Sequence, residues 1–253
     1  MTAGRLLTDP WLRTGTGPRR EPSDAAVRLL CLPHAGAGAA SFNRWLGLFG
    51  PSIAVVRVQL PGREDVAALP AFRRVRDAVD ALLPRVRRHG DLPVALYGHS
   101  MGALVAFELA RALDAEGVPP LHLFVSGRRA PQRPARTAPV HHLPDEAFAA
   151  ALATMGGTAP PLGRSPALLR YSLGLIRADL ELSEEYAYQP GARLGCPITA
   201  FHGTEDPIVT AAEVAAWGDL TAADFGMHAF SGDHFFHQRH RSAIATHITR
   251  ALG

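Results

Sequence analysis

The stretch Tyr97–Ala103, YGHSMGA, places one serine between two glycines at the end of an apolar run. The preceding residues, PVALYG, are typical of a buried strand, and the following segment at 103–113, ALVAFELARAL, has helical spacing. This pattern predicts a tight strand–turn–helix corner. Gly98 and Gly102 lack the Cβ atoms that would clash in such a turn, which would push Ser100 forward in a strained conformation.

The serine in this corner has two interpretations. Glycine and serine are common turn residues, so Ser100 could be incidental to the turn. Alternatively, the pattern is a G-x-S-x-G nucleophile elbow, which requires a strand before the turn and a helix after it. The context favours the second interpretation, because the N-terminal N–H groups of the following helix also favour negative charge that develops at this point.

Short apolar runs recur along the chain, each bounded by Gly, Pro or Asp. They are VRLLCL at 27–32, IAVVRVQL at 53–60, PVALYG at 93–98, LHLFVSG at 121–127, PITAFHG at 197–203 and FGMHAFSG at 225–232. Segments with the three- and four-residue spacing of helices lie between them. The alternation predicts an α/β fold with a mostly parallel central sheet flanked by helices.

The spacing of the runs also predicts the domain organisation. From Leu121 to Pro197 the chain runs for about 75 residues, where neighbouring runs are separated by about 30, which is too long for a simple crossover, and two parts of this span have helical periodicity. We therefore expect a helical lid over residues 137–195, inserted into a core formed by 26–136 and 196–253. Residues 1–25 contain prolines and glycines among charges and are predicted to be a flexible tail.

Composition excludes several classes of function. The 253 residues include 26 Lys and Arg against 23 Asp and Glu, and the scattered arginines give no basic block for nucleic acid. Two cysteines, Cys31 and Cys196, are too few for a disulfide framework. The N-terminal residues contain no apolar stretch long enough for a signal peptide, and nowhere do about 18 uncharged apolar residues run together, so we expect neither a signal peptide nor a membrane span. We expect a soluble, cytoplasmic monomer that binds neither nucleic acid nor membranes.

A serine nucleophile needs a base, and the base needs a partner that fixes its tautomer. In this fold the order is serine, then acid, then histidine, each at the carboxyl end of a strand. The residues after 197–203 offer Glu205 and Asp206, and those after 225–232 offer His234. We choose Asp206 as the orienting acid because its shorter side chain lies in a turn made rigid by the following proline.

Other residues near these positions have competing interpretations. Asp233 could orient His234, but adjacent residues rarely aim at each other. The chain has 12 histidines, and His99 in the elbow is expected to pack or hydrogen-bond at the turn. His234, His237 and His240 have a three-residue spacing that could suggest metal ligation, but they lack cysteine or carboxylate partners in a recognised pattern. No metal site is predicted.

An oxyanion hole requires two N–H donors. Met101, directly after the serine, would supply one, and Ala35 in the loop LPHAGAGAA at 32–40 would supply the other. The same loop partly resembles a dinucleotide fingerprint. Its third glycine is replaced by Ser41, and the next strand, ending near Gln59, has no acid placed for a ribose, so no such cofactor is expected.

Five segments together carry a family resemblance. They are PHAGAG at 33–38, LPGRE at 60–64, GHSMGA at 98–103, HGTEDPIV at 202–209 and GDHFF at 232–236. GHSMG alone is shared by many hydrolases, but the five in this order resemble the type II thioesterases that accompany modular polyketide synthases and nonribosomal peptide synthetases. The likeness spans nearly the whole chain after residue 25.

The resemblance implies an α/β-hydrolase fold with a lid. It also implies an editing role, in which stalled or aberrant acyl groups are hydrolysed from the phosphopantetheine arm of acyl or peptidyl carrier domains, without a metal or redox cofactor. The matching positions carry over as Ser100 nucleophile, His234 base, Asp206 orienter, and Ala35 and Met101 oxyanion donors. The LPGRE segment receives no catalytic role, and its Arg63 and Glu64 are expected to shape the neighbouring loop.

Two other functions remain open at this point. One is an esterase for free small molecules that uses the same three side chains. The other is a hydrolase fold without activity that serves as a binding protein, although such a module needs no complete set of Ser100, Asp206 and His234. For an acidic carrier partner, candidate surface arginines are Arg128, Arg129, Arg133 and Arg136.

Overall fold

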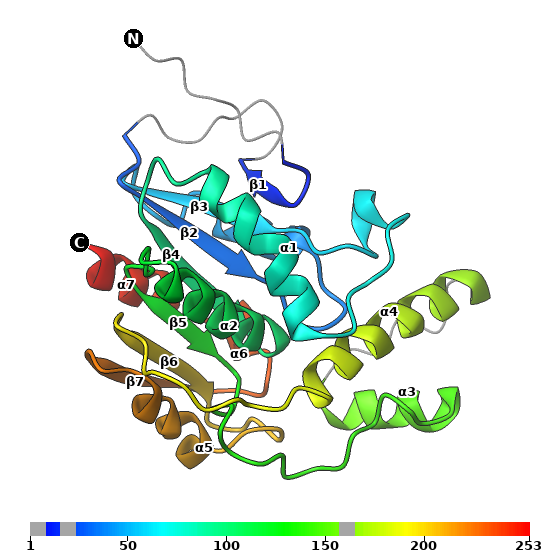
Figure 1. Ribbon diagram of the computed structural model, residues 1–253. Helices are drawn as coiled ribbons and strands as arrows, with labels where there is room; N and C mark the ends of the chain where they lie inside the picture. The colour runs from blue at the N-terminus through cyan, green and yellow to red at the C-terminus, as the bar shows by residue number, and fades with distance from the viewer. Residues whose placement is uncertain (1–8, 16–23, 157–164) are drawn as a thin grey trace.

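A computed structural model describes residues 9–15, 24–156 and 165–253. In these ranges a seven-stranded sheet has the order β1-β3-β2-β4-β5-β6-β7 (Figure 1). Strands β2 to β7 are parallel to their neighbours, and β1 is antiparallel to β3. The strands are β1 Leu12–Thr14, β2 Val27–Leu32, β3 Ile53–Val58, β4 Val94–His99, β5 Leu123–Ser126, β6 Ile198–Gly203 and β7 Phe225–Phe230.

The central strands are buried on both faces, as near-continuous apolar runs predict. Every residue of β2, β3, β5 and β6 is buried. In the register of the sheet, Leu30 of β2 lies opposite Val56 of β3 and Leu96 of β4. The predicted parallel sheet with flanking helices is therefore confirmed, and the six apolar runs of the sequence form β2 to β7.

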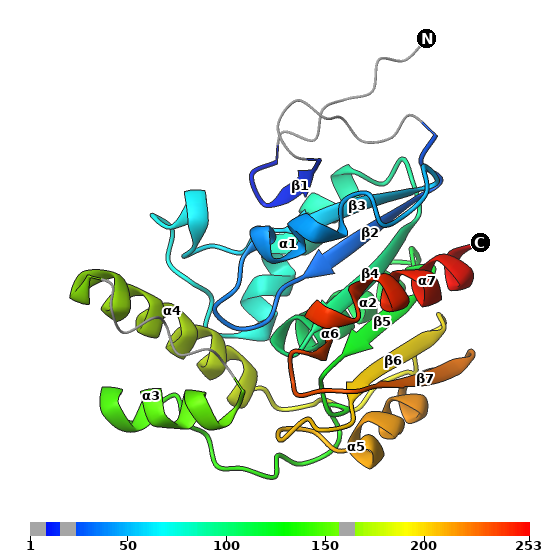
Figure 2. The same ribbon diagram turned by 180° about the vertical axis from the view of Figure 1, so that it is seen from behind.

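Helices cover the sheet on both faces (Figures 1 and 2). Helices α1 Val75–Arg88, α2 Met101–Ala115 and α5 Ala211–Ala215 contribute to one apolar core, together with the 3₁₀ helix η3 Ala216–Leu220. The opposite core contains residues of the 3₁₀ helix η1 Ala39–Trp45, of α6 Phe236–Arg239 and of α7 Arg241–Leu252. Burial of these two cores provides the main favourable contribution to folding.

The segment between β5 and β6 contains the helices α3 Asp145–Thr154 and α4 Pro166–Glu184. Both lie beyond the carboxyl ends of the strands (Figures 1 and 2). They share a small apolar cluster of their own, formed around Phe148, Leu152 and Leu173 and separate from the two sheet cores. Residues 137–195 therefore include a helical insertion at the edge of the sheet where the predicted site residues lie.

The N-terminal segment differs from the prediction. A flexible tail was expected over residues 1–25, but Leu12–Thr14 pairs with β3, and Trp11 and Leu12 are buried. The Arg85 guanidinium lies 4.0 Å above the centre of the Trp11 ring. The physical reason is that β1 covers the otherwise open edge of β3 and buries two apolar side chains. The remainder of that prediction, over 1–8 and 16–23, lies outside the described residues.

Candidate active site

The corner between β4 and α2 holds Ser100 in a strained backbone conformation, with φ 53° and ψ −115°. A Cβ on Gly98 would lie 2.2 Å from the Gly102 carbonyl oxygen, and one on Gly102 would lie 2.2 Å from that of Leu32. Only glycine fits at these two positions. The Ser100 N–H donates to the Ser126 carbonyl oxygen at 2.8 Å, which ties the corner to the end of β5.

Asp206 follows β6 and is held by backbone groups. Its Oδ1 accepts hydrogen bonds from the N–H groups of Ile208 at 2.8 Å and Val209 at 3.3 Å. Its Oδ2 lies 2.7 Å from Nδ1 of His234, and the two side chains are 0% and 4% exposed. With Nδ1 donating to this carboxylate, Nε2 of His234 is left as the acceptor, which is the tautomer that a general base requires.

The other acids considered from the sequence make no such contact. Glu205 is exposed, and Asp233 Oδ1 accepts a hydrogen bond from the Phe235 N–H at 2.9 Å. Asp206 is therefore the carboxylate that the structure places against His234.

Ser100 and His234 both adjoin the end of β5. Ser100 bonds to Ser126, and a Cβ on Gly127 would lie 3.3 Å from Cε1 of His234. Among the described residues, the Ser100 hydroxyl has no hydrogen-bond partner within 3.5 Å, so the structure does not contain a direct Ser100–His234 bond. Such bonds between nucleophile and base are often long in the absence of substrate and shorten when it binds.

Residues 33–40, here called the oxyanion loop, follow β2 beside this corner. In the described part of the chain, the N–H groups of Ala35 and Met101 donate to no protein acceptor, so both are available to a ligand. The loop itself is held by side chains from elsewhere. Gly36 N–H donates to Oδ2 of Asp179 at 2.7 Å, and the Ala37 carbonyl accepts from Arg63 Nη1 at 2.8 Å.

Asp179 is a site residue that the sequence analysis missed. It lies on α4, 1% exposed, and forms an ion pair with Arg63. Its spacing was a usable signal, because Asp179 falls on the same helical face as Leu175 and Leu182, which are also buried. A carboxylate at an apolar position of an amphipathic helix requires a buried partner.

Three further histidines surround His234. The rings of His99 and His237 are 3.7 Å apart, and His99 Nδ1 lies 2.9 Å from the Ser126 hydroxyl. Burial lowers the pKa of His34 to about 4, and it holds the pKa of His99 and of His237 well below the ordinary value. These three rings are therefore neutral near pH 7 and pack against the site. No cluster with metal-ligating composition occurs among the described residues.

Residues 27–252 match the family model of the thioesterase domain. The chain belongs to the thioesterase family. This thioesterase is 39% identical to the gramicidin S biosynthesis protein GrsT of Aneurinibacillus migulanus, over 85% of its own length and 84% of GrsT. It is 41% identical to thioesterase PikA5 of Streptomyces venezuelae, over 84% of its length and 76% of PikA5.

A solved structure agrees with these sequence relatives. The type II thioesterase BorB from the borrelidin biosynthetic cluster has a TM-score of 0.84 and 38% identity, with 96% of both chains covered. The predicted resemblance to type II thioesterases and the α/β-hydrolase fold are thus confirmed, and the thioesterase is a hydrolase that acts on thioesters. None of the helices in the described ranges is long and apolar enough to cross a bilayer.

Two of the arginines considered for a carrier partner, Arg128 and Arg133, form bonds within the protein. Arg128 is bonded to the Ser183 hydroxyl at 2.7 Å, and burial lowers its pKa to about 9. Arg133 is half exposed and pairs with Asp219. Arg128 is half-buried, and its guanidinium is bonded to Ser183 at the end of α4.

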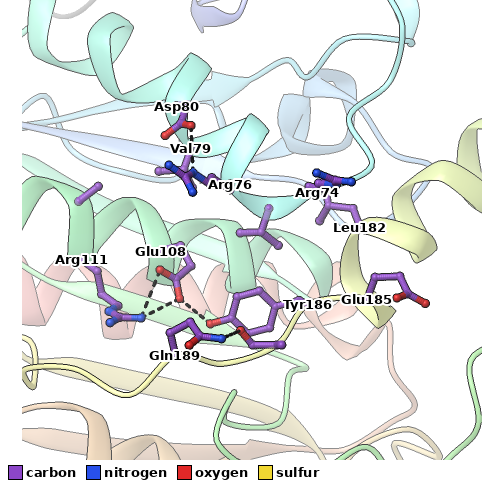
Figure 3. A pocket seen from close by; sticks show the side chains of 13 residues that line it. Arg74, Arg76, Val79, Asp80, Glu108, Arg111, Leu182, Glu185, Tyr186 and Gln189 are labelled. Atoms are coloured by element: carbon purple, nitrogen blue, oxygen red, sulfur yellow. Dashed lines mark hydrogen bonds and ion pairs between the residues drawn. The ribbon is translucent and has the colours of Figure 1, made fainter.

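The thioesterase also has a cavity of about 590 Å³ between α1, α2 and the segment that follows α4 (Figure 3). Several of its polar side chains are paired with each other: Glu108 of α2 bonds to Arg111 and accepts from the Tyr186 hydroxyl. Neither Ser100 nor His234 is among the residues that line it. The cavity is therefore separate from the candidate site.

Proposed function

We propose that this thioesterase hydrolyses stalled or aberrant acyl groups from the phosphopantetheine arm of acyl or peptidyl carrier domains in polyketide or nonribosomal peptide biosynthesis. The observation that carries the mechanism is the 2.7 Å bond between His234 and a buried Asp206, next to a serine in a strained elbow. The names of GrsT and of BorB, which connect both proteins with biosynthetic pathways of this kind, support the substrate class.

In the proposed mechanism, the Ser100 hydroxyl oxygen attacks the thioester carbonyl carbon while His234 Nε2 accepts its proton. The tetrahedral oxygen accepts hydrogen bonds from the N–H groups of Ala35 and Met101. Collapse breaks the carbon–sulfur bond, and the pantetheine sulfur takes the proton from His234. The product of this step is an acyl-enzyme on Ser100.

The second half of the reaction uses the same groups. Water attacks the acyl-enzyme, His234 accepts a proton from the water, and collapse returns that proton to Ser100 with release of the acid. Asp206 stabilises the imidazolium formed in each half. A thiolate is a better leaving group than an amine, so the proposed reaction requires no catalytic side chains beyond Ser100, His234 and Asp206.

The test is release of acyl groups from a loaded carrier domain, followed by intact mass. We expect hydrolysis by the wild type and a loss of roughly a thousandfold or more in Ser100→Ala. Ser242→Ala, at an exposed serine at the start of α7, is the matched control and should retain full activity. Unchanged release in Ser100→Ala would contradict the mechanism.

The same assay separates the alternatives. A carrier-bound thioester should be hydrolysed faster than a free oxygen ester with the same acyl group. The reverse order would indicate an esterase for small molecules, and no hydrolysis of either would indicate a binding protein without activity.

A further inference from the structure

We propose that Arg63 and Asp179 are positioning residues for catalysis, and that this pair holds the oxyanion loop in the conformation that presents Ala35 to the substrate. The proposal rests on the proposed function, since Ala35 is a donor in that mechanism. It makes helix α4, which belongs to the insertion, a part of the catalytic apparatus.

The pair is bidentate and buried. Arg63 Nη2 lies 2.7 Å from Asp179 Oδ1, and Nη1 lies 2.8 Å from Oδ2, with side chains 3% and 1% exposed. Two parallel bonds of this kind fix the relative orientation of both planar groups as well as their distance. The guanidinium and the carboxylate thus form one rigid unit that joins α4 to the loop after β3.

This unit bonds to two consecutive residues of the oxyanion loop, Gly36 and Ala37. Asp179 accepts the Gly36 N–H at 2.7 Å, while Arg63 donates to the Ala37 carbonyl at 2.8 Å. Both bonds lie directly after Ala35 in the chain, and Gly36 has a φ of 77°. A donor and an acceptor fixed this close to Ala35 leave its N–H little freedom to rotate away from the substrate.

The rest of the loop is held from the same side. The N–H groups of Ala39 and Ala40 donate to Gln59 at 2.8 Å and to Glu64 at 3.0 Å. Gln59 in turn donates to the Arg63 carbonyl at 3.2 Å. Asp179 is the side chain from the insertion that bonds to residues 36–40; Gln59, Arg63 and Glu64 come from 59–64, and the Ser41 hydroxyl donates locally to the Gly38 carbonyl at 2.7 Å. Movement of α4 would therefore remove the support nearest to Ala35.

Two substitutions remove the support while keeping most of the volume. Asp179→Asn leaves the guanidinium without its counter-charge. Arg63→Lys keeps the positive charge but loses the planar guanidinium, whose N–H groups donate to both the Asp179 carboxylate and the Ala37 carbonyl. We expect kcat on a carrier-bound thioester to fall roughly 10- to 100-fold in each, because small misplacement of a catalytic group costs this much, with KM changed less than about threefold.

The readouts separate positioning from general damage to the fold. The rates of the variants that keep Ser100 are normalised to active sites titrated to completion with a fluorophosphonate, so that loss of folded protein does not lower the rate per site, and the rate of Ser100→Ala is normalised to protein concentration. A trifluoromethyl ketone that forms a tetrahedral adduct should bind more weakly by about the same factor as kcat/KM falls. A role in stability alone would lower the titrated fraction and leave kcat per site unchanged.

Two other contacts of α4 serve as matched controls. Glu181 pairs with Arg73, and the Tyr171 hydroxyl donates to the Gly62 carbonyl at 2.7 Å. Both tie α4 to the body without touching the oxyanion loop, so Glu181→Gln and Tyr171→Phe should keep kcat within about twofold.

Three results would overturn the proposal: wild-type kcat per site in Asp179→Asn and Arg63→Lys, a change in KM alone, or equal losses in the two controls. If Asp179→Asn does not fold, Arg63→Lys decides the question. Ser100→Ala is measured in parallel. Its full activity would reject the proposed function, whereas its inactivity beside an unaffected Asp179→Asn would reject only the role of the pair.

Discussion

The corner between β4 and α2 and the helical insertion between β5 and β6 are held in place by different interactions. In the corner the contacts are between backbone groups. Gly98 and Gly102 allow approaches so close that a Cβ atom would clash, and the Ser100 N–H donates to the backbone at the end of β5. The insertion has a small apolar cluster of its own and is joined to the body by side-chain contacts: the deeply buried Arg63–Asp179 pair, and Leu182 of α4 in the apolar core of the sheet.

The difference explains what each region contributes. Backbone packing has few alternatives, so the corner holds its geometry with or without substrate. Side-chain contacts have more alternative arrangements than close-packed backbone, so we expect the insertion to be less stable than the corner. The nucleophile is therefore positioned by backbone contacts, while the support that the oxyanion loop receives from α4 depends on one side-chain pair.

The largest effect is expected at Asp206, which follows β6 and acts on the corner through His234. Asp206→Asn keeps the shape of the side chain but favours the wrong tautomer of His234, and kcat should fall by about 10⁴-fold. Glu205→Gln, one residue away and exposed, should have wild-type kcat. Steady-state kinetics on a carrier-bound thioester measure both. Similar losses in the two variants would remove Asp206 from its role.

Glycine-to-alanine substitutions in the two regions should change the free energy of unfolding in opposite directions. Gly98→Ala would place a methyl group against the Gly102 backbone and should lower the free energy of unfolding by about 3 kcal/mol or more. A Cβ on Gly174, inside α4, would meet no atom within 4 Å, so Gly174→Ala should raise helix stability by about 0.5–1 kcal/mol. Urea unfolding of both variants measures the contrast, and a tolerated Gly98→Ala would contradict the packing argument.

The buried histidines give the smallest effect, a dependence of stability on pH. In the unfolded chain a histidine takes up a proton near pH 6.5, whereas burial lowers the folded pKa of His34 and of His122 to about 4. The stability that each contributes is complete above pH 6.5 and is lost as the pH falls from there to about 4.

Urea unfolding at pH 7.5, 6.0 and 5.0 measures this dependence. His122→Gln, away from the site, should lower the slope between pH 6 and 5 by about 1 kcal/mol per pH unit. An unchanged slope in this variant would show that burial does not keep His122 neutral.

The sequence predicts the corner well because its determinants are local. Gly98, Ser100 and Gly102 lie within five residues, and the strand ends that present Asp206 and His234 are marked by apolar runs. The choice of Asp206 over Glu205 also came from a neighbouring residue, Pro207, which follows directly in the chain.

The contacts that the sequence did not predict are formed between distant segments. Asp179 and Arg63 are 116 residues apart, and neither residue by itself indicates the other. Strand β1 was missed because it has only three residues, and it is stable as part of the sheet only through the open edge of β3. The helical spacing of Asp179 indicates that this carboxylate is buried and needs a partner. It does not identify Arg63 as that partner, because the two residues lie far apart in the chain.

The central claim is that Ser100, Asp206 and His234 act as one unit at the edge of the sheet. The most direct test compares Ser100→Ala, His234→Ala and the double variant in single-turnover hydrolysis of a carrier-bound thioester. If the residues act together, the double variant should be no slower than the slower single variant, within about threefold. Losses that multiply in the double variant would show independent contributions and would contradict the account.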